Sequence, residues 1–308
     1  DDEKNIAYIK GYYQIESTYL IPHAVKIQSK VYIVKGVLSR SFGRNQFLKK
    51  IIFSQKSQVE FISANAIYSD CLYLLVLPSS IAKLEEGWNS NIRHITNIRV
   101  DPENKIYKSI DDSILLGKST PEKEEYDIFI LSCASIENYT FPSSIEIIDE
   151  NAFCSTLKSV TFPPDSKLRI IKKRAFSKTS IESISIPSNV TQICEKSFIF
   201  CKKLKNVEFQ SNSNLEIIEK EAFKFCKSLE SIIIPKSVKE ICEGAFNSCE
   251  NLKKITFDQN SMLTEICDST FLQTAIECIT IPSSVKCINK SAFMLCSNLT
   301  KLDFQENS

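Results

Sequence analysis

Apolar positions recur along this chain with a period of about 23 residues. The clearest marker is the dipeptide Ala-Phe or a close variant, which stands at Ala152-Phe153, Ala175-Phe176, Ser197-Phe198, Ala222-Phe223, Ala245-Phe246, Thr270-Phe271 and Ala292-Phe293. Successive phenylalanines of this set are 23, 22, 25, 23, 25 and 22 residues apart. A fixed period in this range indicates a repeat architecture, in which each repeat is one supersecondary unit.

Each repeat contains two segments with different hydrophobic spacing. The first, Leu-x-x-Ile-x-Ile, ends with period-two alternation and predicts a short strand with one buried face. A proline often follows and ends the strand, because it has no amide hydrogen to donate. The second segment, Val-x-x-Ile-x-x-x-Ala-Phe, has three- and four-residue spacing and predicts a helical or 3-10 turn on the return side.

One repeat therefore makes one coil, and a coil of this size does not bury enough apolar surface to stand alone. Stacking covers both open faces of each coil and adds hydrogen bonds between strands. We predict an α/β repeat solenoid with a right-handed coil. Its parallel β-sheet lies on the concave side and short helical or 3-10 turns lie on the convex side.

Weaker copies of the pattern reach toward the N-terminus, through an apolar ladder that runs from Leu48 to Trp88. We assign residues 1–44 to an N-terminal cap and first degenerate repeat, and residues 45–308 to the repeat array. An irregular insert at about 101–131 interrupts the array, with extended segments around residues 114–116 and 127–131. The expectation is one continuous solenoid domain.

The repeat consensus Leu-x-x-Ile-x-Ile-Pro-x-x-Val-x-x-Ile-x-x-x-Ala-Phe-x-x-Cys resembles the BspA-like, or Treponema-pallidum-type, leucine-rich repeat family. Residues 181–201 carry it with Ser197 in place of Ala and Glu195 where Gly is frequent, and residues 276–296 carry Asn289 at that Gly position. The resemblance covers roughly residues 45–308. It implies a leucine-rich repeat fold and a role in cell-surface adhesion and protein binding, without fixing a ligand. It supplies no catalytic residues.

Charge and hydropathy exclude several partner classes. With 38 Lys and Arg against 37 Asp and Glu, the chain has no net field to collect nucleic acid or anionic lipid. The longest apolar run, residues 71–77, is far shorter than the roughly 20 residues of a membrane-spanning helix. The sequence stops just after the strand Leu302-Asp303-Phe304 without a polar capping unit. That ending predicts a fragment of a longer protein, or an edge-to-edge dimer through the uncapped C-terminal repeat.

Candidate chemistry is sparse. The 12 cysteines mostly recur in register with the repeat, so we expect free thiols that pack in turns. There is no Cys-x-x-Cys and there are only 2 His, which leaves no metal site, cofactor site or catalytic residue to predict. Four glycosylation sequons, at Asn138, Asn189, Asn289 and Asn298, give mild support to a secreted route. We predict that the chain is not an enzyme.

The side chains that point outward from the predicted sheet form the candidate binding surface. They are Thr161, Ser185, Asn206, Glu208, Ser231, Ile233, Lys254, Thr256, Thr280, Lys301 and Asp303. The alternative interpretation of these small polar residues is a solvated face that keeps the sheet soluble. The insert, with Tyr107, Pro121 and Tyr126, is a second candidate contact site, since loops that break a solenoid commonly carry specificity.

These observations favour a non-enzymatic module, at the cell surface or secreted, that recognises a partner or host protein such as an extracellular-matrix or cell-surface protein. Two alternatives remain open at this point. One is an intracellular scaffold in the cytoplasm. The other is a repeat domain of a larger protein whose activity lies outside this fragment.

Overall fold

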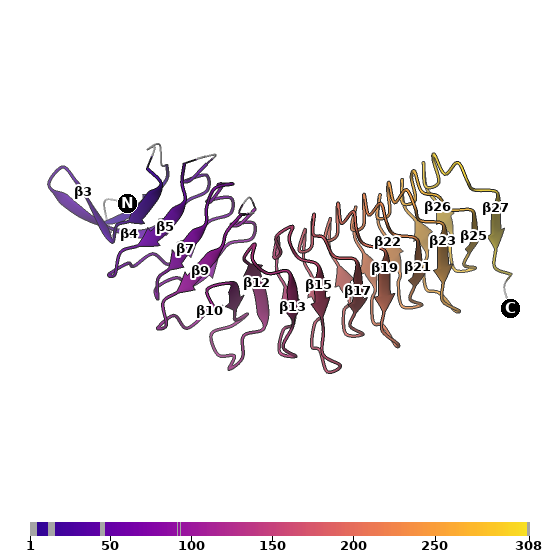
Figure 1. Ribbon diagram of the computed structural model, residues 1–308, viewed down its shortest axis with the longest axis horizontal. Coiled ribbons are helices and arrows are strands. Elements are labelled where there is room, and N and C mark those ends of the chain that lie inside the picture. Colours follow the sequence, from indigo (N-terminus) through magenta and orange to yellow (C-terminus); the bar gives the residue numbers. More distant parts are fainter. Residues whose placement is uncertain (1–4, 12–15, 44–46, 91, 93, 307–308) are drawn as a thin grey trace. The chain divides into compact units, whose positions relative to one another are not determined.

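The computed structural model describes residues 5–11, 16–43, 47–90, 92 and 94–306. These residues form 27 strands and no helix. The chain divides into two compact units, unit 1 (Asp1–Ser135) and unit 2 (Ile136–Ser308). Figure 1 shows the strands of both units along the chain, and each unit is described below by itself.

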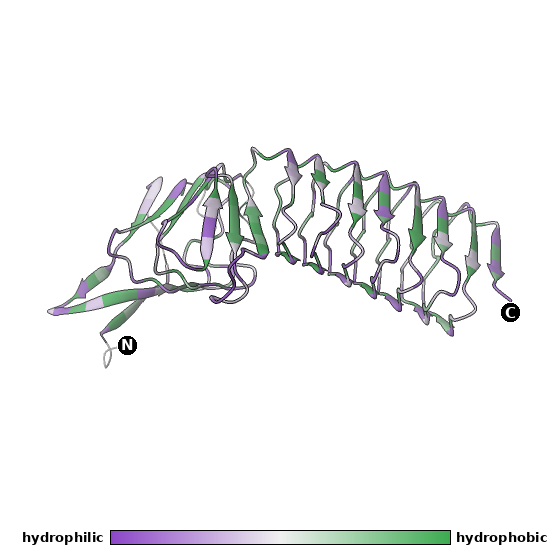
Figure 2. Cartoon of the chain, turned by 90° about the horizontal axis from the view of Figure 1, so that it is seen from below, coloured by the Kyte–Doolittle hydropathy of each residue, from purple (hydrophilic) through white to green (hydrophobic). Residues whose placement is uncertain are grey.

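Unit 2 is a solenoid in which neighbouring coils contribute one long and one short strand each (Figure 2). The long strands are β13 (Asn138–Thr140), β15 (Ser159–Thr161), β17 (Ser183–Ile186), β19 (Asn206–Phe209), β21 (Ser231–Ile234), β23 (Lys254–Phe257), β25 (Cys278–Ile281) and β27 (Lys301–Phe304). The short strands are β14 (Ile147–Ile148), β16 (Ile170–Ile171), β18 (Gln192–Ile193), β20 (Ile217–Ile218), β22 (Glu240–Ile241), β24 (Glu265–Ile266) and β26 (Cys287–Ile288). The described pairings between these coils are parallel, as stacked coils of one hand require.

The recurring phenylalanines form a continuous stack through the core of unit 2. Phe198 lies 5.0 Å from Phe176 and 5.0 Å from Phe223 between ring centroids, with interplanar angles of 2° and 4°. The stack continues in both directions, from Phe153 at one end to Phe293 at the other. Side chains on stacked coils superimpose, so the same residue type repeated at one position makes a ladder of contacts. The predicted elongated core is confirmed within this unit.

The return segment of each coil is not helical, and that prediction was wrong. A short strand is followed by tight turns whose alternate amides donate to the next coil. The N–H groups of Lys196, Phe198 and Phe200 donate to the carbonyls of Lys220, Ala222 and Lys224 at 3.0, 2.8 and 2.9 Å. In a helix these amides would bond within their own coil, four residues back. The described part of the chain is therefore an all-β solenoid.

Left-handed backbone at one recurring turn position also excludes a helix. The residue two before the stacked phenylalanine has positive φ in each coil, at Asn151, Arg174, Lys196, Glu221, Gly244, Ser269 and Ser291. Glycine adopts this conformation without steric cost, yet only Gly244 supplies it here. The glycine position of the repeat is therefore the residue two before the stacked phenylalanine. Glu195 and Asn289, which the sequence pattern assigned to the glycine position, come before that residue in their repeats.

Proline residues divide the row of long strands into pairs. Where a strand ends without proline, the next amide closes the ladder, as Gln210 N–H does on the Ile186 carbonyl (3.1 Å) and Asp258 N–H on the Ile234 carbonyl (3.0 Å). Pro235 occupies the equivalent place after β21 and has no amide hydrogen to give to Phe209. Accordingly β19 and β21 share only the Asn206–Ser231 pairing, whereas β21 and β23 pair along four residues. We call such an opening a seam.

Unit 1 is less regular. Its strands are β1 (Ile6–Ile9), β2 (Thr18–Ile21), β3 (Ala24–Ile27), β4 (Lys30–Val37), β5 (Lys50–Phe53), β6 (Phe61–Ile62), β7 (Leu74–Leu77), β8 (Lys83–Leu84), β9 (Asn97–Val100), β10 (Tyr107–Ile110), β11 (Ile114–Gly117) and β12 (Ile128–Ser132). One parallel sheet has the order β2-β5-β7-β9, and another has β1-β4-β6-β8 with β3 antiparallel to β4. A seam lies between β5 and β7, where Pro78 follows the strand.

The predicted insert contains the two expected extended segments as β11 and β12, and also β10. The three strands form an antiparallel meander. In the expected cap, residues 1–4, 12–15 and 44 lie outside the described residues. The boundaries 1–44 and 45–308, and one continuous solenoid through both units, stay predictions. Among the residues that the structure describes, none belongs to a helix long and apolar enough for a membrane crossing.

Candidate functional site

The eleven predicted surface residues all lie on the long strands of unit 2 or at their ends. Ten of them are exposed and Asp303 is half-buried, while their neighbours along each strand are mostly buried. Strand pairing places them in two rows, because Ser183, Asn206, Ser231, Lys254, Cys278 and Lys301 follow one another in register. We call this surface the strand face of unit 2. Its role in binding stays a prediction.

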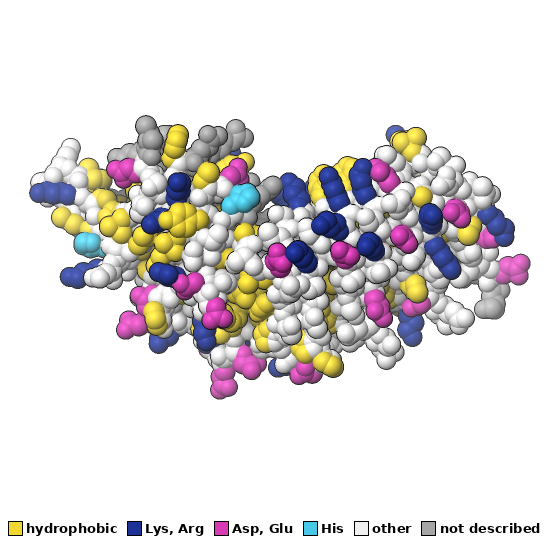
Figure 3. All heavy atoms as spheres, in the orientation of Figure 1, with side chains coloured by type: hydrophobic (Ala, Val, Ile, Leu, Met, Phe, Trp, Pro, Cys, Tyr) yellow, Lys and Arg dark blue, Asp and Glu magenta, His cyan; other side chains and the backbone are white. Residues whose placement is uncertain are grey.

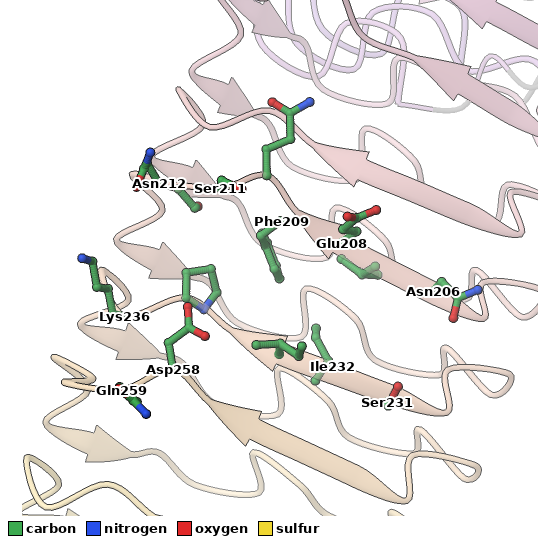
Figure 4. Close-up of a pocket in the computed structure, with 15 residues that line it drawn as sticks. Asn206, Glu208, Phe209, Ser211, Asn212, Ser231, Ile232, Lys236, Asp258 and Gln259 are labelled. Carbon is green, nitrogen blue, oxygen red and sulfur yellow. The ribbon is translucent and has the colours of Figure 1, made fainter. Parts of the chain in front are cut away.

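A groove opens in this face at the seam between β19 and β21 (Figure 4). Its volume is about 720 Å³, and the turn after β19 and residues Asp258 and Gln259 close one end. The half-buried Phe209 ring lies between the two strands, and Pro235 also lines the groove. Ile233 of β21, which is 58% exposed, also lines the groove. The groove therefore combines an apolar centre with a polar border, which is the composition of a binding pocket.

The groove follows from the local sequence. The coil from Asn206 to Ser231 spans 25 residues, against 23 from Ser183 to Asn206, and the added length forms the polar turn after β19. Pro235 then leaves the ladder open at the far end of the two strands. Phe209 occupies an inward position that is buried in β17 and β21, but the open seam leaves its ring partly accessible. Phe209, Lys236 and Asp258 line the groove but were not predicted from the sequence. Pro235 and the longer turn after β19 are the sequence features that indicate where the groove lies.

The charged side chains that line the groove form no ion pair among the described residues; they are Glu208, Lys236 and Asp258. Lys254, on the neighbouring strand β23, forms none either. Other charges pair between adjacent coils at 2.6 to 3.2 Å, as Lys158–Glu137, Arg169–Glu146, Lys172–Asp149, Lys173–Glu195, Lys196–Glu221, Lys205–Glu182, Lys220–Glu243, Lys227–Glu250 and Lys239–Glu216. Charges without internal partners remain available to a ligand.

Several of these ion pairs share residues and form a network at the turns of unit 2. Partial burial opposes ionisation of Glu195, but hydrogen bonds and charges from Lys173 and Lys196 outweigh it and lower the pKa of this carboxyl to about 2. Hydrogen bonds to Glu195 and Glu221 raise the pKa of Lys196. Partial burial opposes ionisation of Glu221, but hydrogen bonds and charges from Lys224 and Lys196 outweigh it and lower the pKa of this carboxyl. These perturbed groups are satisfied by one another, so they indicate structural pairing and not a catalytic site.

Five of the cysteines are buried, and three of these repeat one hydrogen bond in the core of the solenoid. All 12 lie in the described residues and are free thiols. Cys201 donates its thiol hydrogen to the Phe176 carbonyl at 3.0 Å, and Cys226 and Cys249 repeat this bond one coil further on at 3.2 and 3.1 Å. Burial raises the pKa of Cys249 to about 12. In the described part of the chain, no three His, Cys, Asp or Glu side chains are arranged to hold a metal ion.

The insert offers less contact surface than expected. Tyr107 is buried, and its hydroxyl accepts a hydrogen bond from the Leu84 amide at 2.9 Å, so it supports the fold. Pro121 is exposed. Tyr126 is half-buried between the ammonium groups of Lys118 and Lys108, at 5.2 and 6.0 Å from its ring centroid. The expectation of Tyr107 as a contact residue was therefore wrong.

Comparison with protein families finds the BspA-type leucine-rich repeat region, in six copies, over residues 126–224 and 216–308. A search of curated proteins finds no match.

Three bacterial proteins are among the solved structures that this chain is similar to. A leucine-rich repeat protein from Eubacterium ventriosum is 16% identical and gives a TM-score of 0.66, with 98% of this chain and 90% of that chain covered. At this identity the likeness shows the fold. A leucine-rich cell surface protein from Faecalibacterium prausnitzii is 23% identical, with a TM-score of 0.47 and coverage of 98% and 91%. The pneumococcal vaccine antigen PcpA is 17% identical, with a TM-score of 0.46 and coverage of 95% and 90%.

Proposed function

This chain belongs to the BspA-type leucine-rich repeat family, and we propose that it is a non-enzymatic binding module that recognises a partner protein through the strand face of unit 2. The observation that carries the proposal is the groove at the β19/β21 seam, where Ile233 and Phe209 form an apolar centre among polar side chains and charged side chains that form no ion pair. A small apolar centre within a polar rim is the usual anatomy of a protein interface.

The physical character of this face suits protein recognition. Its backbone is held in a parallel ladder, so side chains are presented on a rigid surface and little order has to be gained on binding. Glu208, Lys254 and Asp258 supply both signs of charge, which favours a partner with a matching pattern over a polyanion. Membership in the family supports a location at the cell surface or outside the cell. An extracellular-matrix or host cell-surface protein is the class of ligand that this location favours.

The thiols give no support to an enzymatic role. Burial, together with the nearby carboxylate of Glu240, raises the pKa of Cys242 to about 12, and burial raises that of Cys267 to about 11. A thiol with such a pKa is protonated at neutral pH and is a poor nucleophile. Edge-to-edge pairing of a second copy with β27 stays a prediction.

A binding experiment tests the proposal. The chain is immobilised and exposed to an array of purified extracellular-matrix and cell-surface proteins, with affinity measured by biolayer interferometry. For any protein that binds, Ile233→Asp is expected to weaken binding at least tenfold, because it places a charge in the apolar centre. Glu208→Lys reverses one unpaired charge of the groove and is expected to weaken binding several-fold.

The matched control is Glu240→Lys, which changes an exposed charge on the short strand β22. It is expected to leave the affinity unchanged. Binding that survives both groove variants, or that is lost equally in the control, would exclude this groove as the contact site. Antibody labelling of intact source cells separates a surface location from the cytoplasmic alternative.

A further inference from the structure

The strand face of unit 1 is apolar where the strand face of unit 2 is polar. In the sheet β2-β5-β7-β9, the alternate residues Ile51, Leu75 and Ile98 are fully buried, so the residues between them point outward. The outward residues include Leu20, which is 56% exposed, and half-buried Ile52, Leu74 and Val76. Figure 3 shows a gathering of hydrophobic side chains over β5 and β7. We call these four side chains the unit 1 patch.

A single cation is set into this patch. Strand pairing places Lys50 between Thr18 and Leu74, and its ammonium group lies 5.5 Å from the centroid of the Tyr73 ring. Among the described residues, Lys50 has no carboxylate partner. The other cation on the face, Arg99, is neutralised by Asp112 at 2.6 Å. Lys50 is therefore a half-buried positive charge, oriented by an aromatic ring and available to an anionic group from outside.

From these contacts we propose that the unit 1 patch binds an amphipathic helix of a partner protein, with aliphatic side chains against Leu20, Ile52, Leu74 and Val76 and a carboxylate paired with Lys50. This surface is distinct from the groove of unit 2 and does not depend on the function proposed for that groove.

The dimensions of the patch fit a helix. Four strands at a spacing of about 4.8 Å, each of four residues at about 3.3 Å, give a surface of roughly 14 by 13 Å. One helix, about 10 Å in diameter, covers this surface with two to three turns. The ladder within the sheet uses most of the backbone groups of these strands, so recognition rests on side chains. Packing of a helix on the open face of a sheet is the common way to bury such a face.

The charge pattern favours a protein over a membrane. Binding to an anionic lipid surface takes a cluster of roughly four to eight basic residues. This face has one unpaired cation among the described residues, Lys50, beside the aliphatic side chain of Leu74. One carboxylate flanked by aliphatic residues on a helix matches that arrangement, and the low local polarity strengthens the pair.

A peptide selection tests the inference. A phage-displayed library of helical peptides is panned against the immobilised full chain, and selected peptides are synthesised and measured by fluorescence anisotropy. We expect them to carry aliphatic residues three and four positions apart and one Asp or Glu. Leu20→Ser is expected to weaken binding about tenfold, and its side chain is too exposed for the variant to disturb the core. Leu74→Ser is expected to have a similar effect.

Charge reversal gives the sharpest readout. Lys50→Glu is expected to abolish binding of the acidic peptides, and replacing the acidic residue of the peptide by lysine is expected to restore it. Met294→Ser, which removes an exposed apolar side chain of unit 2 outside the groove, is the control and is expected to change affinity less than twofold. Peptides that bind Leu20→Ser and Leu74→Ser as well as the unchanged chain would overturn the inference.

Two other occupants have outcomes of their own. Co-sedimentation with vesicles of phosphatidylglycerol and phosphatidylcholine, lost in Lys50→Glu, would assign the patch to lipid and overturn the inference. Concentration-dependent dimers in analytical ultracentrifugation, lost in Leu20→Ser, would assign it to a second copy of the chain and overturn it equally. A negative result in these experiments would not contradict the function proposed for the groove of unit 2. The variants that test the groove lie on other strands.

Discussion

Unit 1 and unit 2 use the same outward positions of equivalent strands for different surfaces. On unit 2 these positions hold mostly polar and charged residues, with Ile233 as the one exposed aliphatic side chain among the described ones, whereas on unit 1 they include Leu20, Ile52, Leu74 and Val76. Coil geometry does not require either choice, because the outward side chains contribute little to the buried core. The difference teaches that the two units, although built alike, are suited to different partners.

The cores differ as well. Unit 2 repeats one phenylalanine per coil, and the rings stack at 4.8 to 5.8 Å. In unit 1 the fully buried large residues are of mixed type, such as Phe42, Ile67 and Trp88. Unit 2 therefore derives stability from repetition, and unit 1 from individual contacts. Four sets of substitutions test this contrast.

The largest effect is expected from Phe223→Ala. The Phe223 ring is fully buried and stacks on both Phe198 and Phe246, at 5.0 and 5.3 Å. Its loss leaves a cavity in the ladder and is expected to lower the unfolding free energy of unit 2 by about 3 to 5 kcal/mol. Chemical denaturation followed by hydrogen-exchange mass spectrometry measures the loss in each unit separately. The control Phe225→Ala removes a half-buried ring and should cost clearly less; equal losses would contradict the ladder as the main support.

Asn104→Ala is the corresponding substitution in unit 1. This buried side chain donates to the carbonyls of Pro78 and Ile81, both at 2.9 Å, and accepts from the amides of Ile106 and Tyr107. Removing it leaves several buried backbone groups unsatisfied, so we expect a loss of about 2 to 3 kcal/mol. Thermal unfolding, combined with hydrogen-exchange mass spectrometry of the unit 1 peptides, measures this loss of stability. Asn97→Ala, whose amide donates to the Thr96 hydroxyl at the surface, should have almost no effect.

Substitutions to and from glycine at the left-handed turn position test the regularity of unit 2. Ser269 has φ 53° and Gly244, at the equivalent position, has φ 62°. Ser269→Gly relieves the steric cost of this conformation and is expected to stabilise unit 2 by about 1 kcal/mol. Gly244→Ala is expected to destabilise it by about 1 kcal/mol, and since its nearest neighbour would be 3.5 Å away, the loss would come from the backbone alone. Urea unfolding measures both, and shifts of the same sign would contradict this explanation.

The smallest effect is expected from the ion-pair network of unit 2. The pKa of Glu195 is about 2 in the folded chain, against an ordinary value of 4.5, so its stabilisation is present above pH 4.5 and is lost as the pH falls toward 2. Because the side chain is still 29% exposed, we expect only about 1 kcal/mol or less. Glu195→Gln should lower the melting temperature at pH 7 and converge with the unchanged chain near pH 2. A constant difference from pH 7 to pH 2 would rule out the titration of Glu195, and the exposed Glu182→Gln serves as the control.

Much of the core was predictable because burial repeats in the sequence. The inward residues that the pattern identified in unit 1 are mostly buried, and Leu48, Ile51 and Leu75 are fully buried, whereas Leu84 is half-buried. The unit 1 patch was not predicted, since β7 reads Leu-Leu-Val-Leu and a run that is apolar throughout does not show which side faces out. The groove was missed because it depends on two neighbouring coils of unequal length, which no single repeat reveals.

The amino-acid sequence by itself determined the period, the stacked phenylalanines and the two rows of outward side chains in unit 2, because each of these depends only on spacing within a coil. Only the tertiary structure decided that the return segment is a strand with turns. The amides of Lys196, Phe198 and Phe200 find their acceptors in the next coil, more than 20 residues along the chain. Hydrogen bonds of that range leave no trace in local periodicity, and the same is true of the seam that opens where Pro235 lacks an amide.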